Sequence, residues 1–130
     1  MTSEHRVLVV DDDAEVLEVM SRQLTHLGYA CTIAANGCDA LALMQCSDFD
    51  IVFIDLVMPG MDGLELLDAM QEAKVDTIAI VVSGRGNIAT AVEAMKRGAF
   101  DYLEKPFDIR LHKFAQVKGV VEPIKVLIES

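Results

Sequence analysis

Short apolar runs rich in β-branched residues alternate along the chain with longer segments in which apolar residues recur every three or four positions. Short continuous apolar runs are typical of strands that are buried on both faces of a parallel sheet. Spacings of three and four residues are typical of helices that bury one face. The pattern therefore predicts strands at residues 7–10, 31–33, 51–54, 78–82 and around 100–103.

Helices are predicted in the intervals between these strands. The first should end at Gly28, the second should begin at the turn pair Asn36-Gly37, and the fourth should end at Gly98. The predicted buried faces are Val16, Val19, Met20, Gln23 and Leu27, then Ala40, Leu41 and Met44, then Leu64, Leu67, Ala69 and Met70, and last Ala89, Val92, Met95 and Ala99. The alternation of strands and helices predicts an α/β domain with a doubly wound parallel sheet and helices on both faces.

The composition fits one globular domain, because 130 residues with 52% hydrophobic side chains can bury a sizeable core. No apolar run approaches the roughly 18–20 residues of a membrane span, and the N-terminus has no signal-peptide pattern, so we expect a cytoplasmic protein without membrane contact. With 21 acidic and 11 basic residues, the net charge of −10 argues against direct nucleic-acid binding. Cys31, Cys38 and Cys46 lack a CxxC spacing and are expected to be reduced core thiols and not a disulfide framework or a zinc site.

Polar side chains follow four of the predicted strands. Asp11 and Asp12 follow the first strand, Asp55 the third, Ser83 the fourth and Lys105 the fifth. All strands of a parallel sheet end at the same edge, and ligands of such sheets bind at that carboxyl edge. We therefore expect these five side chains, which come from separate segments, to converge on one rim.

The residue types on this rim suit phosphoryl transfer. Carboxylates that lie close together cannot all stay ionised without a counter-charge, which a hard divalent cation such as Mg²⁺ supplies through oxygen ligands. An aspartate can also be the nucleophile that accepts a phosphoryl group. Such a reaction needs mainly positioning and charge neutralisation, and a lysine and a hydroxyl opposite the metal would provide both.

These motifs resemble those of receiver domains of bacterial two-component response regulators. The resemblance extends in order over about residues 5–107. It is carried by VLVVDDD at 7–13, DLVMPGMDGLELL at 55–67, VVSG at 81–84 and AMKRGAFDYLEKPF at 94–107. The stretch at 88–107 is most similar to receivers that precede transcription-activating output domains. The resemblance implies a flavodoxin-like (βα)5 fold with the strand order 2-1-3-4-5.

The resemblance also assigns a role to each carboxylate. Asp55 would be the phospho-acceptor. Asp12 would bind Mg²⁺ or Mn²⁺ directly, Asp11 would bind it largely through water, and the backbone carbonyl of Val57 would complete the protein ligands. From the residues themselves, Asp13 is expected to begin the first helix, where its charge suits the backbone N–H groups.

Further residues of the resemblance surround the acceptor. Ser83 and Lys105 would stabilise the phosphoryl group. The bond between Lys105 and Pro106 would be cis, and Pro59 belongs to the loop that follows the acceptor. By the resemblance, Val57 and Arg85 stand at the positions that tune how water reaches the acyl phosphate.

The resemblance implies a switch driven by a partner protein. Asp55 would take phosphate from a phosphohistidine of a sensor kinase or phosphotransfer protein. The hydroxyl of Ser83 would then move toward the phosphoryl oxygen, and the ring of Tyr102 would turn inward behind it. This would reshape the face of the fourth helix, fifth strand and fifth helix. The alternative for Tyr102 is a plain half-buried core tyrosine.

Two other functions remain open from the residues alone. VLVVDDDAEV also resembles the nucleophile motif of haloacid-dehalogenase-type phosphatases, in which Asp11 would be the nucleophile and Asp13 the general acid. That family needs a further acidic pair after Lys105. A phosphatase of this type would also leave the motif DLVMPGMDG at 55–63 without a role. The other alternative is an interaction module that is never phosphorylated. We favour the receiver, which would be no enzyme beyond its own phosphorylation and dephosphorylation.

The C-terminal segment departs from the family. Apolar residues at 109, 111, 114, 117 and 121 form a rough helical stripe, but Gly119 and Pro123 disfavour a continuous helix. We predict a receiver domain at 1–118, and at 119–130 an atypical tail or the start of a linker. The apolar residues 126–128 are expected to pack on the domain's helices or on a second subunit, which would make a homodimer. No output domain is recognised, so an excised receiver is favoured.

Overall fold

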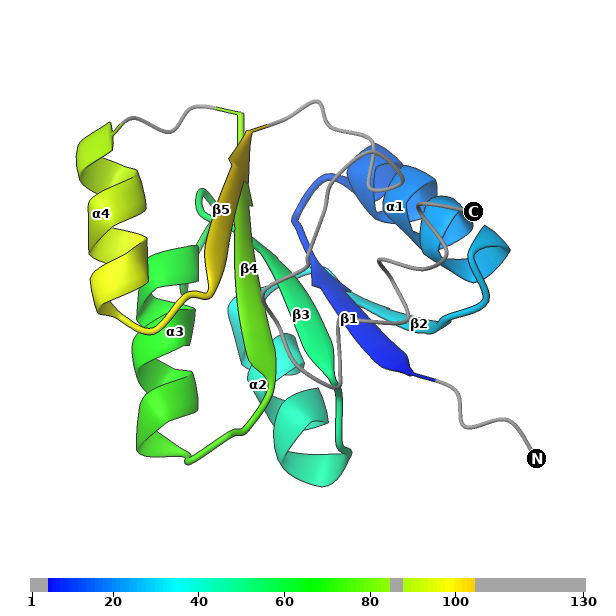
Figure 1. Ribbon diagram of the computed structural model, residues 1–130, viewed down its shortest axis with the longest axis horizontal. Coiled ribbons are helices and arrows are strands. Elements are labelled where there is room, and N and C mark those ends of the chain that lie inside the picture. The colour runs from blue at the N-terminus through cyan, green and yellow to red at the C-terminus, as the bar shows by residue number, and fades with distance from the viewer. Residues whose placement is uncertain (1–4, 85–87, 105–130) are drawn as a thin grey trace.

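The structure is a computed structural model of the chain, and it describes residues 5–84 and 88–104. Within these residues, five parallel strands form one sheet in the order β2-β1-β3-β4-β5 (Figure 1). The strands are β1 (Arg6–Val10), β2 (Ala30–Ala34), β3 (Ile51–Asp55), β4 (Ile78–Ser83) and β5 (Asp101–Glu104). The predicted fold class and strand order are confirmed, and the strands lie within one or two residues of their predicted positions.

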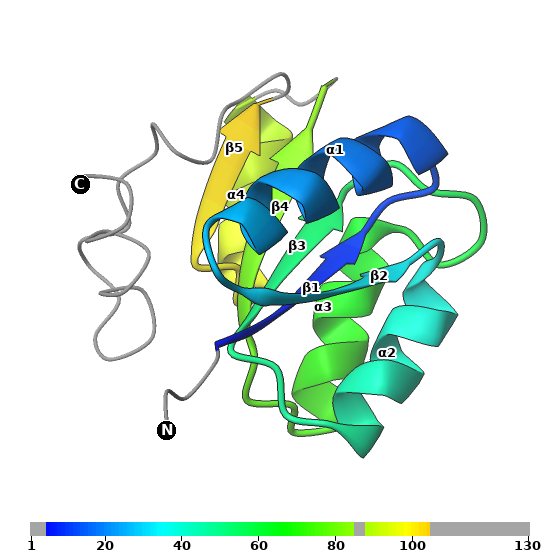
Figure 2. The same cartoon turned by 90° about the vertical axis from the view of Figure 1, so that its right-hand side faces the viewer.

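Helices cover both faces of the sheet (Figure 2). They are α1 (Ala14–His26), α2 (Gly37–Cys46), α3 (Gly63–Glu72) and α4 (Ile88–Lys96). Val7 and Val9 of β1 pack in the cluster that contains α1, whereas Leu8 and Val10 pack in the cluster that contains α2, α3 and α4. Neighbouring residues of one strand are thus buried on opposite faces, which explains why the strands are continuously apolar.

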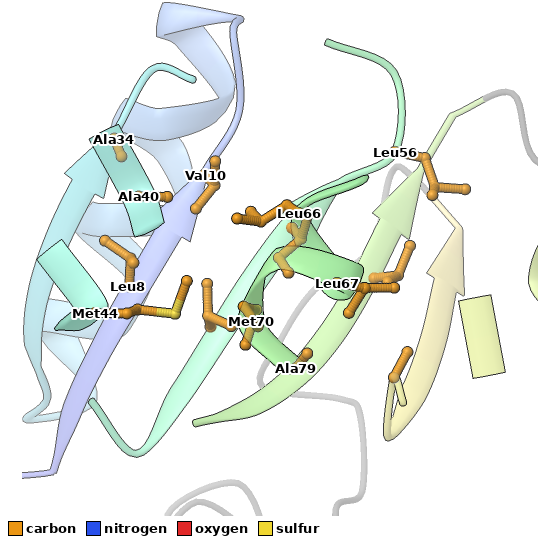
Figure 3. Packing of buried hydrophobic residues seen from close by; sticks show 14 of the residues in the cluster. Leu8, Val10, Ala34, Ala40, Met44, Leu56, Leu66, Leu67, Met70 and Ala79 are labelled. Atoms are coloured by element: carbon orange, nitrogen blue, oxygen red, sulfur yellow. The ribbon is translucent and has the colours of Figure 1, made fainter. Parts of the chain in front are cut away.

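The larger cluster fills the space between the sheet and the helices α2 and α3 (Figure 3). Met44 of α2 and Met70 of α3 reach toward Leu8 and its neighbours, and both methionines are less than 10% exposed. Long flexible methionine side chains suit such a gap, because they fill irregular space between branched residues. Together with the cluster on the α1 side, this cluster buries the central strands on both faces.

Polar N-cap residues precede three of the helices, each in the loop that leaves the carboxyl edge of the sheet. The side chain of Asp13 caps α1, Asn36 caps α2, and Asp62 caps α3 in a capping box with Glu65. These caps satisfy backbone N–H groups that have no partner inside the helix. The predicted stops at Gly28 and Gly98 are also confirmed, since both have positive φ, at 97° and 102°.

The buried faces of three helices differ from those predicted. In α3 the structure buries Leu66, which was not predicted, whereas the predicted Leu64 and Ala69 are only half-buried. In α1 the buried residues are Leu17, Met20 and Leu24, whereas the predicted Val19 is 53% exposed. Apolar residues occupy two overlapping stripes of α1, and the sheet buries the stripe that carries the larger side chains. In α4 the predicted Val92 and Met95 are exposed, and only Ala94 is buried.

The prediction that the cysteines lie in the core is wrong for two of them. Cys38 and Cys46 are exposed at the two ends of α2, whereas Cys31 on β2 is half-buried.

In the portion of the chain that the structure describes, no helix combines the length and apolar character needed to cross a membrane. The predicted C-terminal stripe and the tail at 119–130 lie outside the described residues.

Candidate functional site

Three carboxylates meet at the carboxyl edge of the sheet. Asp11 and Asp12 follow β1, and Asp55 is the last residue of the neighbouring strand β3. One oxygen from each of them lies within 4.8 Å of the others. Asp11 and Asp55 are buried, at 2% and 7% exposure, whereas Asp12 is exposed. The structure thus brings together the carboxylates that the sequence predicted at separate strand ends. The cluster is open to solvent on the side of Asp12.

The three consecutive aspartates have different surroundings. Asp11 accepts a hydrogen bond from the backbone N–H of Asp13 at 2.9 Å, so part of its carboxylate binds its own loop. Asp13 in turn accepts from the backbone N–H of Glu15 at 2.9 Å and caps α1, as predicted. Asp12 is the exposed member of the group, and its carboxylate is accessible to water and to a hydrated ion.

The backbone around Asp55 is held from two sides. The N–H of Leu56 donates to the carbonyl of Val82 at 3.3 Å, which continues the pairing of β3 with β4. The N–H of Gly63 donates to the carbonyl of Leu56 at 3.0 Å, so the first residue of α3 closes the loop onto the strand end. A Cβ on Gly63 would lie 2.7 Å from the carbonyl oxygen of Asp55. The first residue of α3 therefore lies against the backbone of Asp55 and Leu56.

This role of Gly63 was not predicted from the sequence. A usable signal was present, because Asp62 and Glu65 have the spacing of a capping box and place the helix start at position 63. The sequence shows where α3 begins, but not that its first residue lies against the acceptor strand.

The hydroxyl and aromatic candidates lie on the strands next to β3. Ser83 ends β4 at 1% exposure, one residue beyond Val82, which is the register partner of Asp55. Tyr102 lies on β5 with its ring half-buried against the larger core cluster. Its hydroxyl is buried, and among the described residues it has no hydrogen-bond partner.

The remaining predicted residues divide into two groups. Val57 and Pro59 are exposed on the loop after Asp55, with the Val57 side chain 59% exposed. Arg85, Lys105 and Pro106 lie outside the described residues. Their predicted roles, and the cis bond before Pro106, therefore stay predictions.

A doubly wound sheet with acidic residues at the carboxyl ends of adjacent strands defines a class of α/β domains with a site at that edge. The model of the family described as the response regulator receiver domain matches residues 7–114. The chain belongs to this family and is a receiver domain, a signalling module. This membership excludes the haloacid-dehalogenase-type alternative.

Two curated relatives illustrate the match. The chain is 41% identical over 103 residues to the DNA-binding transcriptional regulator NtrC of Salmonella typhimurium. The aligned residues make up 79% of the chain and 22% of the relative. It is 38% identical over 106 residues to the nitrogen assimilation regulatory protein NtrX of Azorhizobium caulinodans, covering 80% of the chain and 23% of the relative. The chain thus spans less than a quarter of the length of these proteins.

Solved structures give the same result. A CheY-like receiver domain protein from Methanospirillum hungatei has a TM-score of 0.76 and 31% identity, covering 81% of this chain and 84% of that one. A response regulator from Burkholderia pseudomallei, solved with a phosphorylated aspartic acid, a calcium ion and citrate, has a TM-score of 0.75 and 35% identity, covering 80% and 61%. The fold and the family therefore agree with the site at the carboxyl edge.

Proposed function

We propose that Asp55 accepts a phosphoryl group from the phosphohistidine of a sensor kinase or phosphotransfer protein. The observation that carries this proposal is the convergence of Asp11, Asp12 and Asp55 within 4.8 Å at the end of the central strands. In the transfer, a carboxylate oxygen of Asp55 forms a bond to phosphorus while the bond from phosphorus to the donor nitrogen breaks. The product is an acyl phosphate on Asp55.

The donor set suits Mg²⁺ or Mn²⁺, because all three side chains offer carboxylate oxygens and one of them is exposed. Asp12 would hold the ion directly, Asp11 would act largely through water, and the carbonyl of Val57 would contribute a ligand. The hydrogen bond that Asp11 accepts from Asp13 supports its indirect role. When bound, the ion supplies neutralisation of charge on the phosphoryl oxygens.

The other site residues would respond to the new phosphoryl group. Ser83 would donate to a phosphoryl oxygen, and Lys105 would pair with the group. Tyr102 would turn further inward and change the surface of α4 and β5, which would control an output domain or partner. Val57 and Arg85 would set the rate at which water removes the phosphoryl group.

The kind of output is proposed from the relatives. NtrC of Salmonella typhimurium is described as a DNA-binding transcriptional regulator, so control of transcription is the output we propose. This chain would act through a partner or output domain and not bind nucleic acid itself, in keeping with its net charge of −10. We further propose that the protein is located in the cytoplasm and that it forms a homodimer. The receiver domain would comprise residues 1–118, followed by a tail at 119–130.

Incubation with acetyl phosphate tests this function. The parent chain should gain one phosphoryl group in the presence of Mg²⁺, and none when EDTA removes the ion, because the crowded carboxylates then repel the donor. Intact-mass measurement reads the adduct, and peptide mapping should place it on Asp55. A chain that gains no adduct with Mg²⁺ would be the unphosphorylated interaction module, and an adduct on Asp11 would also contradict the proposal.

Neutralising Asp12 should weaken the binding of Mg²⁺ and raise the stability of the metal-free domain. Like charges about 5 Å apart repel by about 1 kcal/mol even in water, so Asp12→Asn should unfold at higher urea concentration than the parent in EDTA. The parent should gain stability when Mg²⁺ is added, and the variant should gain little. Urea unfolding with and without Mg²⁺ measures both effects.

Asp13→Asn is the matched control for this pair of measurements. It removes the same charge one residue away and keeps a good N-cap, so its response to Mg²⁺ should equal that of the parent. An equal response of Asp12→Asn and Asp13→Asn would rule out Asp12 as a metal ligand.

A further inference from the structure

Arg97, the residue after α4, ties the C-terminal end of this helix to α3. Its Nη1 lies 2.8 Å from Oδ2 of Asp68 on α3, and its Nε lies 3.0 Å from Oε1 of Glu93 on α4. Gln71 of α3 donates from Nε2 to the carbonyl oxygen of Arg97 at 2.8 Å. Each helix thus contributes a donor and an acceptor to the other. We call Asp68, Gln71, Glu93 and Arg97 the α3–α4 clamp.

The backbone is shaped to admit this clamp. Gly98 has a φ of 102°, and a Cβ at this position would lie 2.5 Å from Nε2 of Gln71. Only glycine therefore lets Gln71 reach across the end of α4 to the carbonyl of Arg97. The Arg97 side chain is 31% exposed, so the clamp is partly sheltered from water.

The apolar attachment of α4 is thin by comparison. Ala94 is its one buried residue, while Ile88, Val92 and Met95 are 85%, 47% and 45% exposed. Ala94 is small, and about half of the surface of Val92 and Met95 stays exposed, so the polar clamp adds to a limited apolar contact in fixing α4 on the domain. Figure 1 shows α4 at the side of the molecule, next to α3 and β5.

The opposite end of α4 is close in sequence to the functional site. Ser83 ends β4, and α4 begins at Ile88, five positions later. The buried face of α4 is also close to a residue that the proposed switch moves, since Tyr102 packs against the cluster that contains Ala94. A rearrangement around Asp55 therefore acts on the N-terminal end and the buried face of α4, while the clamp holds the C-terminal end.

We propose that the α3–α4 clamp holds α4 in its described position against the switch, and that Arg97 is the positioning residue that sets how readily the switch occurs. The inference rests on the proposed phosphorylation of Asp55. An interaction that is stronger in one of two states favours that state, and any ligand of the other state must work against it. Weakening the clamp therefore raises the affinity of the site for a phosphoryl group.

Arg97→Ala tests the clamp with a chemical mimic of the phosphoryl group. Beryllofluoride should be titrated with Mg²⁺ and its affinity measured by calorimetry for the parent and the variant. Removing one partly exposed ion-pair network should raise the affinity about two- to fivefold. Lys96→Ala, which removes the same charge from the neighbouring exposed position, should leave the affinity unchanged. Arg97→Lys keeps the charge without the planar fork and should give an intermediate value.

A double-mutant cycle separates a switch role from a merely structural one. Asp68→Asn alone should also raise the affinity, and combined with Arg97→Ala it should add less than its separate effect, because both changes cut the same contact. Unchanged or weaker beryllofluoride binding by both single variants would overturn the inference, even if urea unfolding showed a loss of stability. If the parent itself bound no beryllofluoride and gained no phosphoryl group, the proposed function would fail first and the clamp with it.

Discussion

Asp55→Asn is expected to gain no phosphoryl group from acetyl phosphate, with or without Mg²⁺, while its stability stays at or above that of the parent. The amide has the shape of the carboxylate but not the anionic oxygen that attacks phosphorus, so the reaction loses its nucleophile. Removing one of three crowded negative charges also relieves repulsion with Asp11 and Asp12. Intact mass and urea unfolding, measured on the same sample, separate lost chemistry from lost structure.

Asp50→Asn provides the matched control at the other end of β3, one residue before the strand begins. Asp50 precedes β3 at the opposite edge of the sheet, where it accepts from the backbone N–H of Arg6 at 2.8 Å and pairs with His5 at 3.4 Å. An asparagine oxygen can still accept the backbone bond, so this variant should fold and gain the adduct like the parent. An adduct on Asp55→Asn, or its absence on Asp50→Asn in a folded protein, would contradict the assignment of Asp55.

The parts of the fold that the sequence predicted are those governed by short-range chemistry. β-branched runs predicted the strands because a strand buried on both faces leaves no polar position. Asp13 predicted the start of α1, and Gly28 and Gly98 predicted helix ends, because caps and positive φ are local requirements. The convergence of Asp11, Asp12 and Asp55 followed from topology, since the strands of a parallel sheet all end at one edge.

The parts that were mispredicted depend on how an element is rotated against the rest of the domain. In α1, Val19 and Leu17 are equally plausible from spacing, and only packing on the sheet shows that Leu17 is inside. In α4, the apolar stripe with Val92 and Met95 is exposed, because the sheet and α3 meet the helix on the side of Ala94. A periodic pattern gives the existence of a face but not the direction in which that face points.

Two sets of contacts were also beyond the sequence, those of the α3–α4 clamp and those between Gly63 and the end of β3, since they join segments far apart or use the backbone. The Arg97 contact with Asp68 spans 29 positions, and no local pattern specifies it. Gly63 can approach Asp55 closely because glycine has no Cβ. A glycine at the start of a helix does not by itself indicate such a contact. Mutating such contacts therefore tests what the sequence pattern alone does not show.

Gly63→Ala is expected to destabilise the domain by about 1–3 kcal/mol and to slow phosphorylation of Asp55 by about tenfold or more. The new Cβ would lie 2.7 Å from the carbonyl oxygen of Asp55, 2.8 Å from Cα of Leu56 and 3.2 Å from Cγ2 of Ile54. Ile54 and Asp55 belong to β3, a central strand packed on both faces, and Leu56 directly follows it, so these atoms cannot move without shifting Asp55. Urea unfolding gives the loss of stability, and the rate of adduct formation with acetyl phosphate and Mg²⁺ gives the loss of function.

Gly37→Ala is the control that isolates this backbone clash. Gly37 is the first residue of α2 and follows a capping asparagine, just as Gly63 is the first residue of α3 and follows a capping aspartate. The three atoms nearest to its added Cβ all belong to the side chain of Met61, at 3.0–3.1 Å, so Met61 need shift by only a few tenths of an ångström and the strand that carries Asp55 is not contacted. Because alanine favours the helix by up to about 1 kcal/mol over glycine, Gly37→Ala should be neutral or stabilising and should react at the parent rate. Equal rates for Gly63→Ala and Gly37→Ala would show that the first residue of α3 does not position Asp55.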